Sequence, residues 1–595
     1  MMKQFFKFTL ASLAGFLIAG ILFVLIATGI FTSLVSSTNK APEIEENTVL
    51  LIKFDKAIYD REVSDLSMLS DVMNGDMGTS MGLTEFLEVM NRAKTDSKIK
   101  AVMLDLSILQ TNGWATVEEM REALIDFKSS GKKIYAYSDM FTQSAYYLAS
   151  AADELVLNPA GMLTLTGLGA EVMYYKDLLD KFDIDVDLIR PRNNAYKSAG
   201  ERYIKNKMSE ENREQVKVYL NAIWDYVAEN MAKSRHLDVN VLNSKVSSLE
   251  ICLPEDALRN KLVDKLSFRS DVQDMICNEV RTKHKLGEKA KVSFVKYSKY
   301  RKTMPDIFLP QKENIAVVYA FGDVNRGKGS EVSIGSETIV KALQKAVANK
   351  RVKAIVLRVN SPGGDAVASE LITNEVIKAK KKKPVIVSMG DVAASAGYEM
   401  SSNATKIVAS PITITGSIGV FGVMPNFARS LKNNLGITFD TVKTHDNSIA
   451  LTVTSPVSQD VRLMMQRNVE NFYDNFITRV ATGRQRDKAY IDSIARGRVW
   501  AGTQAKELGL VDEFGGLRTA IEMAAKEAGI KGSYGIVAYP KAKDLATQIM
   551  EAFSGEARLK NFTEQLGKPY SFFLELRNIC MMQGVQARMP YLINF

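Results

Sequence analysis

The sequence predicts an α/β protein made of two tandem copies of one domain of stacked β-α-β units, after a single N-terminal transmembrane helix. Three observations support this prediction. A long uncharged segment lies near the amino terminus, apolar strands alternate with amphipathic helices, and a series of similar blocks recurs about 250 residues further along the chain. The length of 595 residues also exceeds one ordinary domain, since domains average about 100–200 residues.

The amino-terminal segment has the length and composition of a membrane span. Phe8–Val35 contains no charged residue and exceeds the roughly 20 apolar residues that cross a bilayer. Lys3 and Lys7 precede it and glutamates follow it, so we expect a cytoplasmic N-terminus and the rest of the chain on the outer side. The alternative is a signal peptide cleaved near Ser36, although the apolar core of such peptides is normally only about 7–15 residues long.

The rest of the chain contains two similar halves. KIKAVMLDLS at 98–107 corresponds to RVKAIVLRVN at 351–360, and YYLASAADELVLNP at 146–159 corresponds without a gap to YEMSSNATKIVASP at 398–411. In each half, short apolar runs alternate with amphipathic segments such as ETIVKALQKAVANK at 337–350. This alternation is typical of β-α-β units with parallel strands.

The matched blocks also predict the domain boundaries. We expect an N-terminal stub and transmembrane anchor over 1–46, a first repeat over 47–300, a second repeat over 301–545 and a C-terminal tail over 546–595. The tail matches nothing in the other half. Its apolar composition would allow it to pack on the protein or to contact a membrane.

Composition argues against several classes of function. The 77 lysines and arginines exceed the 68 acidic residues by nine, but they are spread along the chain, so no nucleic-acid partner is expected. The densest run, Lys380–Lys383, fits the carboxyl end of a helix, where cations are favoured. There is no CxxC pair and no histidine beside a Gly-rich or Ser-rich motif, so we expect no metal, disulfide framework or cofactor. The residues concerned are Cys252, Cys277, Cys580, His236, His284 and His445.

A serine-containing turn distinguishes the second half from the first. Ser395, in MGDVAASAGYEMSS at 389–402, follows the apolar run Val385–Val387 and is surrounded by small residues. One interpretation is a tight strand-to-helix turn, and the other is a nucleophile that a substrate backbone approaches closely. The first half has Gln143 at the equivalent position, or Ser144 if the alignment slips by one residue.

A Gly-Gly segment and a second hydroxyl are also confined to the second half. SPGGD follows an apolar strand and precedes a helix, so we expect a turn whose backbone N–H groups could hold the oxyanion of an acyl-transfer intermediate. A plain tight turn would explain the glycines equally well. The first half has Ser107–Gln110 in place of Ser361–Gly364, and Leu168 in place of Ser417.

A nucleophilic serine needs a base, and the first half contains a candidate. His445 is the only histidine of the second half and lies in a polar stretch typical of a loop. Lysine can act as a base where burial lowers the pKa of its amine. Lys197, in RNNAYKSAGERY, has no counterpart in the second half, where the aligned position is near Ala450. Lys197 could equally be a solvated loop residue, and a catalytic role would require one site shared by both halves.

Five motifs resemble those of one peptidase family. VNSPGGD, MGDVAASAGY, TGSIGVFG, AYKSAGE and GRVWAGTQAKELGLVDEFGG together resemble the signal peptide peptidases of the protease IV type, in their long duplicated form, over about residues 47–540. The resemblance implies the Clp protease/crotonase fold and a Ser/Lys dyad that degrades cleaved signal peptides. It also implies a place in the bacterial cytoplasmic membrane, with the catalytic domains on the outer, periplasmic side.

The resemblance also implies roles for individual residues. Ser395 would be the nucleophile and Lys197 the general base, with Ser417 hydrogen-bonded to the lysine. The backbone N–H groups implied for an oxyanion hole belong to Gly363 or Gly364 and to Ala396. The lysine motif of this family is KSAVEP, whereas the sequence here is KSAGER, so Glu201 is kept and the proline is not.

Two other functions fit the same sequence. An acyl-CoA-processing enzyme of the crotonase type would use carboxylates as acid and base, without a membrane anchor or a Ser/Lys pair. A non-catalytic membrane scaffold would not react with a serine-directed acylating probe. For the peptidase we expect peptide substrates and a homo-oligomer of few chains, such as a tetramer. Lys197 and Ser395 could meet within one chain or across a subunit boundary.

Overall fold

A computed structural model describes residues 43–62, 80–111, 113–541 and 585–589, together with isolated residues between 7 and 22. The predicted transmembrane segment, Phe8–Val35, therefore falls almost entirely outside the described residues. Within the described part of the chain, no helix has both the length and the apolar character needed to span a bilayer.

The first half forms a six-stranded parallel sheet in the order β8-β6-β5-β4-β1-β9. Helices connect consecutive central strands, as the β-α-β pattern predicts. The strands are β1 (Thr48–Lys53), β4 (Ile99–Asp105), β5 (Lys133–Phe141), β6 (Glu154–Leu163), β8 (Lys265–Leu266) and β9 (Ser293–Lys296). The connecting helices are α3 (Leu83–Thr95), α4 (Trp114–Lys128) and α5 (Gln143–Ala149).

The second half forms an eight-stranded sheet with the path β19-β17-β15-β13-β10-β21, and β16 pairs with both β15 and β20. Its pairs are parallel except for β17 with β19. The strands are β10 (Asn314–Phe321), β13 (Val352–Ser361), β15 (Val385–Ala394), β16 (Lys406–Ala409), β17 (Ile414–Gly416), β19 (Val499–Ala501), β20 (Glu513–Phe514) and β21 (Gly535–Tyr539). Its connecting helices are α13 (Ser336–Ala348), α14 (Ala366–Lys380) and α15 (Ala396–Ser401).

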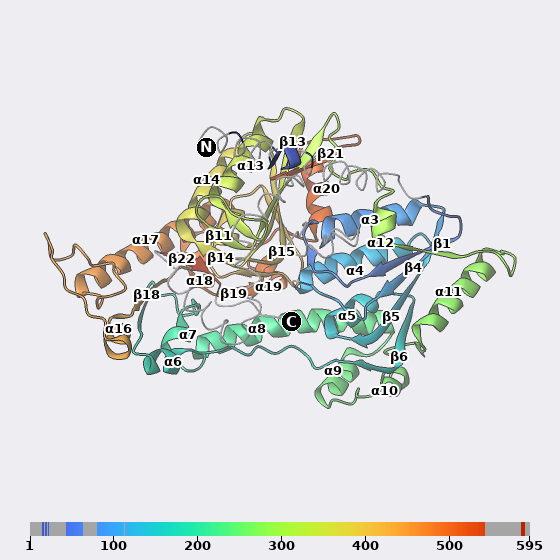
Figure 1. Ribbon diagram of the computed structural model, residues 1–595, viewed down its shortest axis with the longest axis horizontal. Coiled ribbons are helices and arrows are strands. Elements are labelled where there is room, and N and C mark those ends of the chain that lie inside the picture. The colour runs from blue at the N-terminus through green and yellow to red at the C-terminus, as the bar shows by residue number, and fades with distance from the viewer. Residues whose placement is uncertain are drawn as a thin grey trace.

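The two halves repeat one topology, which confirms the predicted duplication. The order β9-β1-β4-β5-β6-β8 recurs as β21-β10-β13-β15-β16-β20. Helices α3 and α13 both have 13 residues, and α4 and α14 both have 15. A helix of 26 residues follows in each half, α8 (Glu210–Arg235) and α17 (Gln459–Arg484), and a serine side chain caps the amino terminus of each. In Figure 1 the first sheet lies on the right and the second in the centre.

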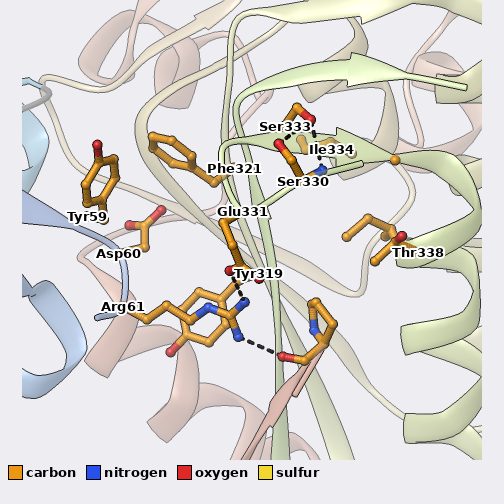
Figure 2. A pocket seen from close by; sticks show the side chains of 13 residues that line it. Tyr59, Asp60, Arg61, Tyr319, Phe321, Ser330, Glu331, Ser333, Ile334 and Thr338 are labelled. Atoms are coloured by element: carbon orange, nitrogen blue, oxygen red, sulfur yellow. Dashed lines mark hydrogen bonds and ion pairs between the residues drawn. The ribbon is translucent and has the colours of Figure 1, made fainter. Parts of the chain in front are cut away.

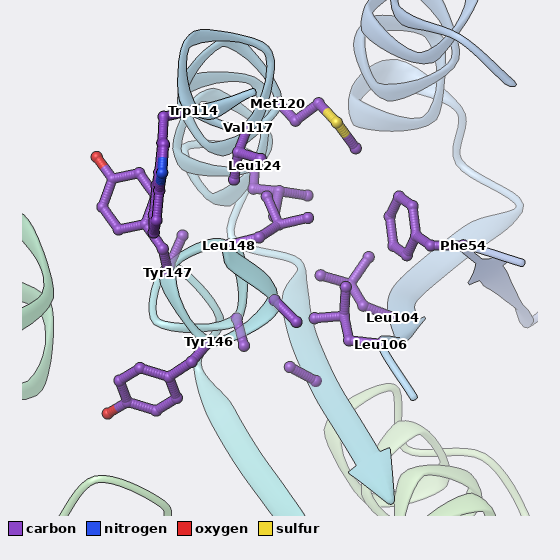
Figure 3. Packing of buried hydrophobic residues seen from close by; sticks show 14 of the residues in the cluster. Phe54, Leu104, Leu106, Trp114, Val117, Met120, Leu124, Tyr146, Tyr147 and Leu148 are labelled. Carbon is purple, nitrogen blue, oxygen red and sulfur yellow. The ribbon is translucent and has the colours of Figure 1, made fainter. Parts of the chain in front are cut away.

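On one face of the first sheet, helices α4 and α5 contribute to a buried apolar core. Val117, Met120 and Leu124 recur at intervals of three and four along α4, which places them on one side of the helix. Figure 3 shows these side chains near residues of α5 and near residues at the ends of β1 and β4, and all of these side chains are buried. Burial of one such side chain contributes about 1.5–3 kcal/mol. Their partners in this view are Phe54, Leu104, Leu106, Tyr146, Tyr147 and Leu148.

Buried polar contacts join the two halves beside β15. Asp391 of β15 accepts hydrogen bonds from the backbone N–H and the hydroxyl of Thr116 in the first turn of α4, at 2.8 and 2.6 Å. Arg358 of β13 is fully buried and forms ion pairs with Asp60 at 2.8 Å and with Glu119 at 2.7 Å. Both acidic partners belong to the first half, so these contacts hold the strand that ends at Ala394 against that half.

Candidate active site

Ser395 lies at the junction of β15 and α15. Its side chain is fully buried, and its backbone N–H donates to the carbonyl of Gly416 at 2.8 Å. The backbone has φ 56° and ψ −116°, a combination that costs a non-glycine residue about 1–3 kcal/mol. Small neighbours are required here, because a Cβ on Gly397 would stand 2.8 Å from the Ser361 carbonyl oxygen. The predicted strand-to-helix turn is therefore present, and its serine is held in a strained conformation.

The loop that carries Lys197 belongs to the first half but packs on the second. It follows β7 (Asp185–Ile189), which pairs antiparallel with β18 (Gly422–Asn426) of the second half. The guanidinium of Arg190 donates to the Lys197 carbonyl at 3.1 Å. The next contact crosses between the halves, because the Tyr196 N–H donates to the Arg496 carbonyl at 3.1 Å.

The structure brings Lys197, Ser395 and Ser417 together within one chain. Lys197 Nζ lies 2.8 Å from Ser395 Oγ, 2.9 Å from the Ser417 carbonyl oxygen and 3.0 Å from Ser417 Oγ. The Ser417 carbonyl and the Ser417 hydroxyl can each accept a hydrogen bond from one of the two N–H groups of a neutral amine. The lone pair of that amine is then free to accept the proton of the Ser395 hydroxyl.

Burial favours the neutral form of the Lys197 amine. The side chain is fully buried, and desolvation lowers its pKa well below the ordinary value for lysine. The hydrogen-bond partners of its Nζ in the described structure are all uncharged oxygens, which provide no carboxylate to stabilise the ammonium. The solvated-loop interpretation of Lys197 is therefore wrong for this structure.

Replacement of Lys197 by methionine is expected to raise the melting temperature at neutral pH, with a gain that shrinks as the pH rises. The unfolded chain binds a proton on this lysine below about pH 10.4, whereas the folded chain does not until the pH falls to the lowered pKa. Within that window the stability of the unmodified protein increases with pH. Thermal unfolding of both proteins across the window measures the effect, and a pH-independent difference would contradict it.

The Gly-Gly segment forms a strand, so the prediction of a turn at this position is wrong. Gly363–Asp365 forms β14, which pairs with β11 (Asp323–Asn325) on one edge and with β22 (Gln586–Arg588) on the other. Gly363 has φ 106°, and a Cβ at this position would stand 2.2 Å from the Ala587 carbonyl oxygen. Partners on both edges impose the extended form, and they approach so closely that only glycine fits.

The implied oxyanion-hole residues lie beside Ser395. A Cβ built on Gly363 would stand 3.0 Å from Ser395 Cβ and 3.1 Å from the Ala396 backbone nitrogen. The Gly363 N–H donates to Ser361 Oγ at 3.2 Å. Gly364 is the next residue of β14, and Ala396 is the first residue of α15. The backbone of Gly363 and that of Ala396 therefore lie close together beside Ser395.

The equivalent position in the first half is filled by an amide. Gln143 Oε1 accepts from the backbone N–H groups of Thr166 and Gly167, both at 2.8 Å, and its Nε2 donates to the Gly167 carbonyl at 2.9 Å. The Ser144 hydroxyl lies 3.3 Å from the Thr142 hydroxyl. At the position of Ser395, the first half thus has an amide side chain that is hydrogen-bonded to the backbone.

His445 lies outside this arrangement. Its side chain is exposed, and its ring nitrogen lies 3.0 Å from Thr444 Oγ1, whereas Ser395 is fully buried. In the part of the chain that the structure describes, no group of three or more His, Cys, Asp or Glu residues is arranged to hold a metal ion.

Two supporting residues were not assigned a role from the sequence. Gly497 has φ 81°, and a Cβ there would stand 2.5 Å from Lys197 Cβ, so only glycine allows the lysine loop to approach. Glu201 is buried, accepts from Ser209 Oγ at 2.7 Å and lies 3.6 Å from Arg190. Both residues belong to motifs that carried the family resemblance, GRVWAG and KSAGER, which was the available signal.

A small cavity between the halves lies apart from these residues. Figure 2 shows Arg61 beside the ring of Tyr319, with its guanidinium bonded to Glu331 at 3.2 Å and to the Pro540 carbonyl at 2.7 Å. The cavity encloses about 50 Å³ and none of the residues around Ser395 lines it. It is too small for a peptide.

A serine hydroxyl in contact with a buried lysine amine, within a duplicated α/β fold, has the features of a serine hydrolase. Comparison with known proteins identifies the family. The chain matches Peptidase family S49 at residues 126–283 and 377–531, once in each half. The chain belongs to this family and is a serine peptidase.

Individual relatives extend over most of the chain. It is 34% identical over 519 residues to Protease 4 of Haemophilus influenzae, which covers 84% of this chain and 82% of the relative. It is 30% identical over 535 residues to the chloroplastic serine protease SPPA of Arabidopsis thaliana, which covers 88% of this chain and 76% of the relative. Among solved structures, a mutant of ClpP1 from Listeria monocytogenes matches 34% of this chain and 94% of its own, with 16% identity and a TM-score of 0.23.

Proposed function

We propose that the protein is a membrane-anchored endopeptidase that degrades cleaved signal peptides with a dyad of Ser395 and Lys197. The observation that carries the proposal is the 2.8 Å distance between Ser395 Oγ and the fully buried Lys197 Nζ. Serine alone is a weak nucleophile, and a neutral amine at this distance is a suitable general base. The family resemblance supports the choice of signal peptides as substrate, and the relatives named above are proteases.

The proposed reaction proceeds through an acyl-enzyme. Ser395 Oγ attacks the peptide carbonyl carbon while Lys197 Nζ takes the hydroxyl proton. The lysine then donates that proton to the leaving amine as the peptide bond breaks, which leaves an ester on Ser395. Water attacks the ester while Lys197 takes a proton from it, and the lysine passes that proton to Ser395 Oγ as the ester bond breaks, which releases the acid product and restores the serine hydroxyl. Ser417 holds the amine in line with Ser395 throughout.

The negative charge of the tetrahedral intermediate requires nearby N–H donors. We assign this role to the backbone N–H of Ala396 and to that of Gly363 or Gly364. Removal of one such donor in other hydrolases costs about 10²–10³ in rate. For the Gly363 N–H, the bond to Ser361 Oγ would be exchanged for one to the oxyanion as the intermediate forms.

The proposal places the protein in the bacterial cytoplasmic membrane, with its domains in the Clp protease/crotonase fold on the outer side. Its parts are the anchor over 1–46, the repeats over 47–300 and 301–545, and the tail over 546–595. The uncharged run Phe8–Val35 supports the anchor. Assembly into a homo-oligomer of few chains, such as four, is part of the same proposal.

Extraction from membranes tests the anchor. A retained transmembrane helix is expected to keep the full-length protein in the pellet through washes with high salt and with alkaline carbonate, and to release it only in detergent. A chain that begins at residue 43 is the matched control and is expected in the soluble fraction. Release of the full-length protein by carbonate alone would rule out the anchor.

An acyl-enzyme trap tests the proposed chemistry. A serine-directed acylating probe is expected to add one adduct to the chain, at Ser395 by peptide mapping, and to block peptide hydrolysis in parallel. The Ser395→Ala variant should remain unlabelled, and the Ser144→Ala variant should be labelled like the unmodified protein. A folded protein that hydrolyses peptides yet is labelled elsewhere, or not at all, would overturn the dyad.

A further inference from the structure

A segment from the carboxyl-terminal tail lies beside Ser395, in the strand position between β14 and Phe421 that is called the groove below. Its strand β22 pairs antiparallel with β14, so that Asp365, Gly364 and Gly363 face Gln586, Ala587 and Arg588 in turn. On the opposite edge, the backbone N–H of Gln586 donates to the Phe421 carbonyl at 2.8 Å, and the Phe421 N–H donates back at 2.9 Å. Figure 1 places β22 beside β14. The segment thus has backbone partners on both edges.

Further contacts hold both ends of this segment. The Ala366 N–H donates to the Val585 carbonyl at 3.3 Å, and the Met589 N–H donates to the Pro362 carbonyl at 2.8 Å. Val585, Ala587 and Met589 are buried, and Arg588 forms an ion pair with Asp323. Gln586 is buried too, so only Arg588 of this segment is partly exposed. Backbone hydrogen bonds along a strand, together with buried side chains, are the means by which extended peptides are recognised at sheet edges.

The carbonyl of Ala587 lies close to the proposed catalytic residues. Its oxygen is 2.2 Å from the point at which a Cβ on Gly363 would stand, and the same point lies 3.0 Å from Ser395 Cβ and 3.1 Å from the Ala396 nitrogen. One glycine therefore has the Ala587 carbonyl, the proposed nucleophile and a proposed oxyanion donor around it. The Ala587 side chain is fully buried.

We propose that Val585–Met589 is a built-in pseudosubstrate. It occupies the strand position of a peptide substrate, with the Ala587 carbonyl at the position of the scissile carbonyl, and it must leave before another peptide can bind. The proposal rests on the proposed function, because it takes this groove to be the substrate site. It adds a regulatory step, since occupancy by the tail reduces the fraction of molecules that can accept substrate.

A bulky residue at position 587 tests the proposal in the full-length protein. The fully buried alanine has no room for an aromatic ring, so Ala587→Tyr is expected to expel the strand. Hydrolysis of a fluorogenic peptide should then show a KM lowered by about fivefold or more at nearly unchanged kcat, because competition for the groove raises only the apparent KM. Ala489→Tyr, at an exposed alanine of α18 (Lys488–Ile494), is the matched control.

A KM for Ala587→Tyr equal to that of the unmodified protein and of Ala489→Tyr would overturn the pseudosubstrate. Melting temperatures of both variants show whether the fold is retained. If Ala587→Tyr proves unstable, Arg588→Glu replaces it, because a carboxylate facing Asp323 repels the strand without adding bulk. The same lowering of KM is expected of that variant, and an unchanged KM would count against the proposal in the same way.

Peptide binding provides a readout independent of hydrolysis. A labelled, end-blocked peptide with the sequence of residues 585–589, VQARM, is expected to bind the full-length double variant Ser395→Ala, Ala587→Tyr about fivefold or more tightly than Ser395→Ala alone. VQYRM is the control peptide, and it should bind neither protein. Equal affinity for the two peptides would overturn the inference.

These measurements separate the two proposals. If neither the unmodified protein nor any variant hydrolyses peptides, but VQARM binds and VQYRM does not, the proposed peptidase chemistry is refuted and the assignment of the groove as a peptide site is retained. If peptides are hydrolysed at Ser395, but the KM is unchanged by substitution of residue 587 and the two peptides bind equally well, the pseudosubstrate proposal is refuted and the peptidase proposal is retained.

Discussion

Replacement of Ser395 by alanine is expected to abolish peptide hydrolysis, with a loss in kcat of about 10⁴-fold or more. The change removes the one oxygen that lies 2.8 Å from the Lys197 amine, so no acyl-enzyme forms. The fold should persist, because alanine fits wherever serine fits and the backbone N–H still donates to Gly416. Hydrolysis of a fluorogenic peptide by the purified protein measures the loss, and the melting temperature reports the fold.

Ser144→Ala is the matched control in the first half. Its hydroxyl contacts only that of Thr142 among the hydrogen bonds described for it, and Gln143 occupies the position equivalent to Ser395. We expect its kcat to stay within about twofold of the unmodified protein, as for surface changes away from a site. Equal losses from both variants would mean that the halves are functionally equivalent, contrary to the asymmetry between Gln143 and Ser395.

Replacement of Lys197 is expected to be nearly as severe. Lys197→Ala removes the base, and Lys197→Arg should also abolish turnover, because a guanidinium does not lose its proton at working pH. With an ordinary pKa near 10.4, fewer than about one lysine in a thousand would be neutral at pH 7, so the lowered pKa of the buried amine is essential. Steady-state hydrolysis measures both losses, and Lys207→Arg, at an exposed lysine nearby, is the matched control.

The pH dependence of the unmodified protein follows from the same amine. In the proposed dyad the neutral amine is the base, so kcat/KM should rise with pH through the lowered pKa of Lys197 and level off well below pH 10. Substantial hydrolysis by Lys197→Arg would rule out the dyad. His445→Ala would then be the next variant to test, although His445 is exposed and Ser395 is not.

Much of the fold followed from the sequence because the chain repeats itself. Both halves carry the same β-α-β pattern, so parallel sheets were expected in each of them. The same comparison isolated Ser395, Ser417 and Lys197 as differences between the copies. The lysine remained ambiguous, because its burial depends on Gly497 and Ser417, which are about 300 and 220 residues away in the chain.

The parts that the sequence did not reveal depend on distant partners. Gly363–Asp365 has the composition of a turn and becomes a strand only because Val324 and Ala587 pair with its two edges. The strand β22 is three residues long, too short for a periodic pattern. The burial of Arg358 depends on Asp60 and Glu119, which lie in the other half.

The placement of Lys197 and Ser395 in different repeats sets the number of sites per molecule. Each 66.0-kDa chain has two folded repeats but one pair of these residues, so an active-site titration should count one equivalent per chain. Since both residues meet within one chain, we expect that two coexpressed chains, one without Lys197 and the other without Ser395, do not restore activity to each other. Under the proposed dyad, loss of either repeat would therefore remove the activity of the whole chain.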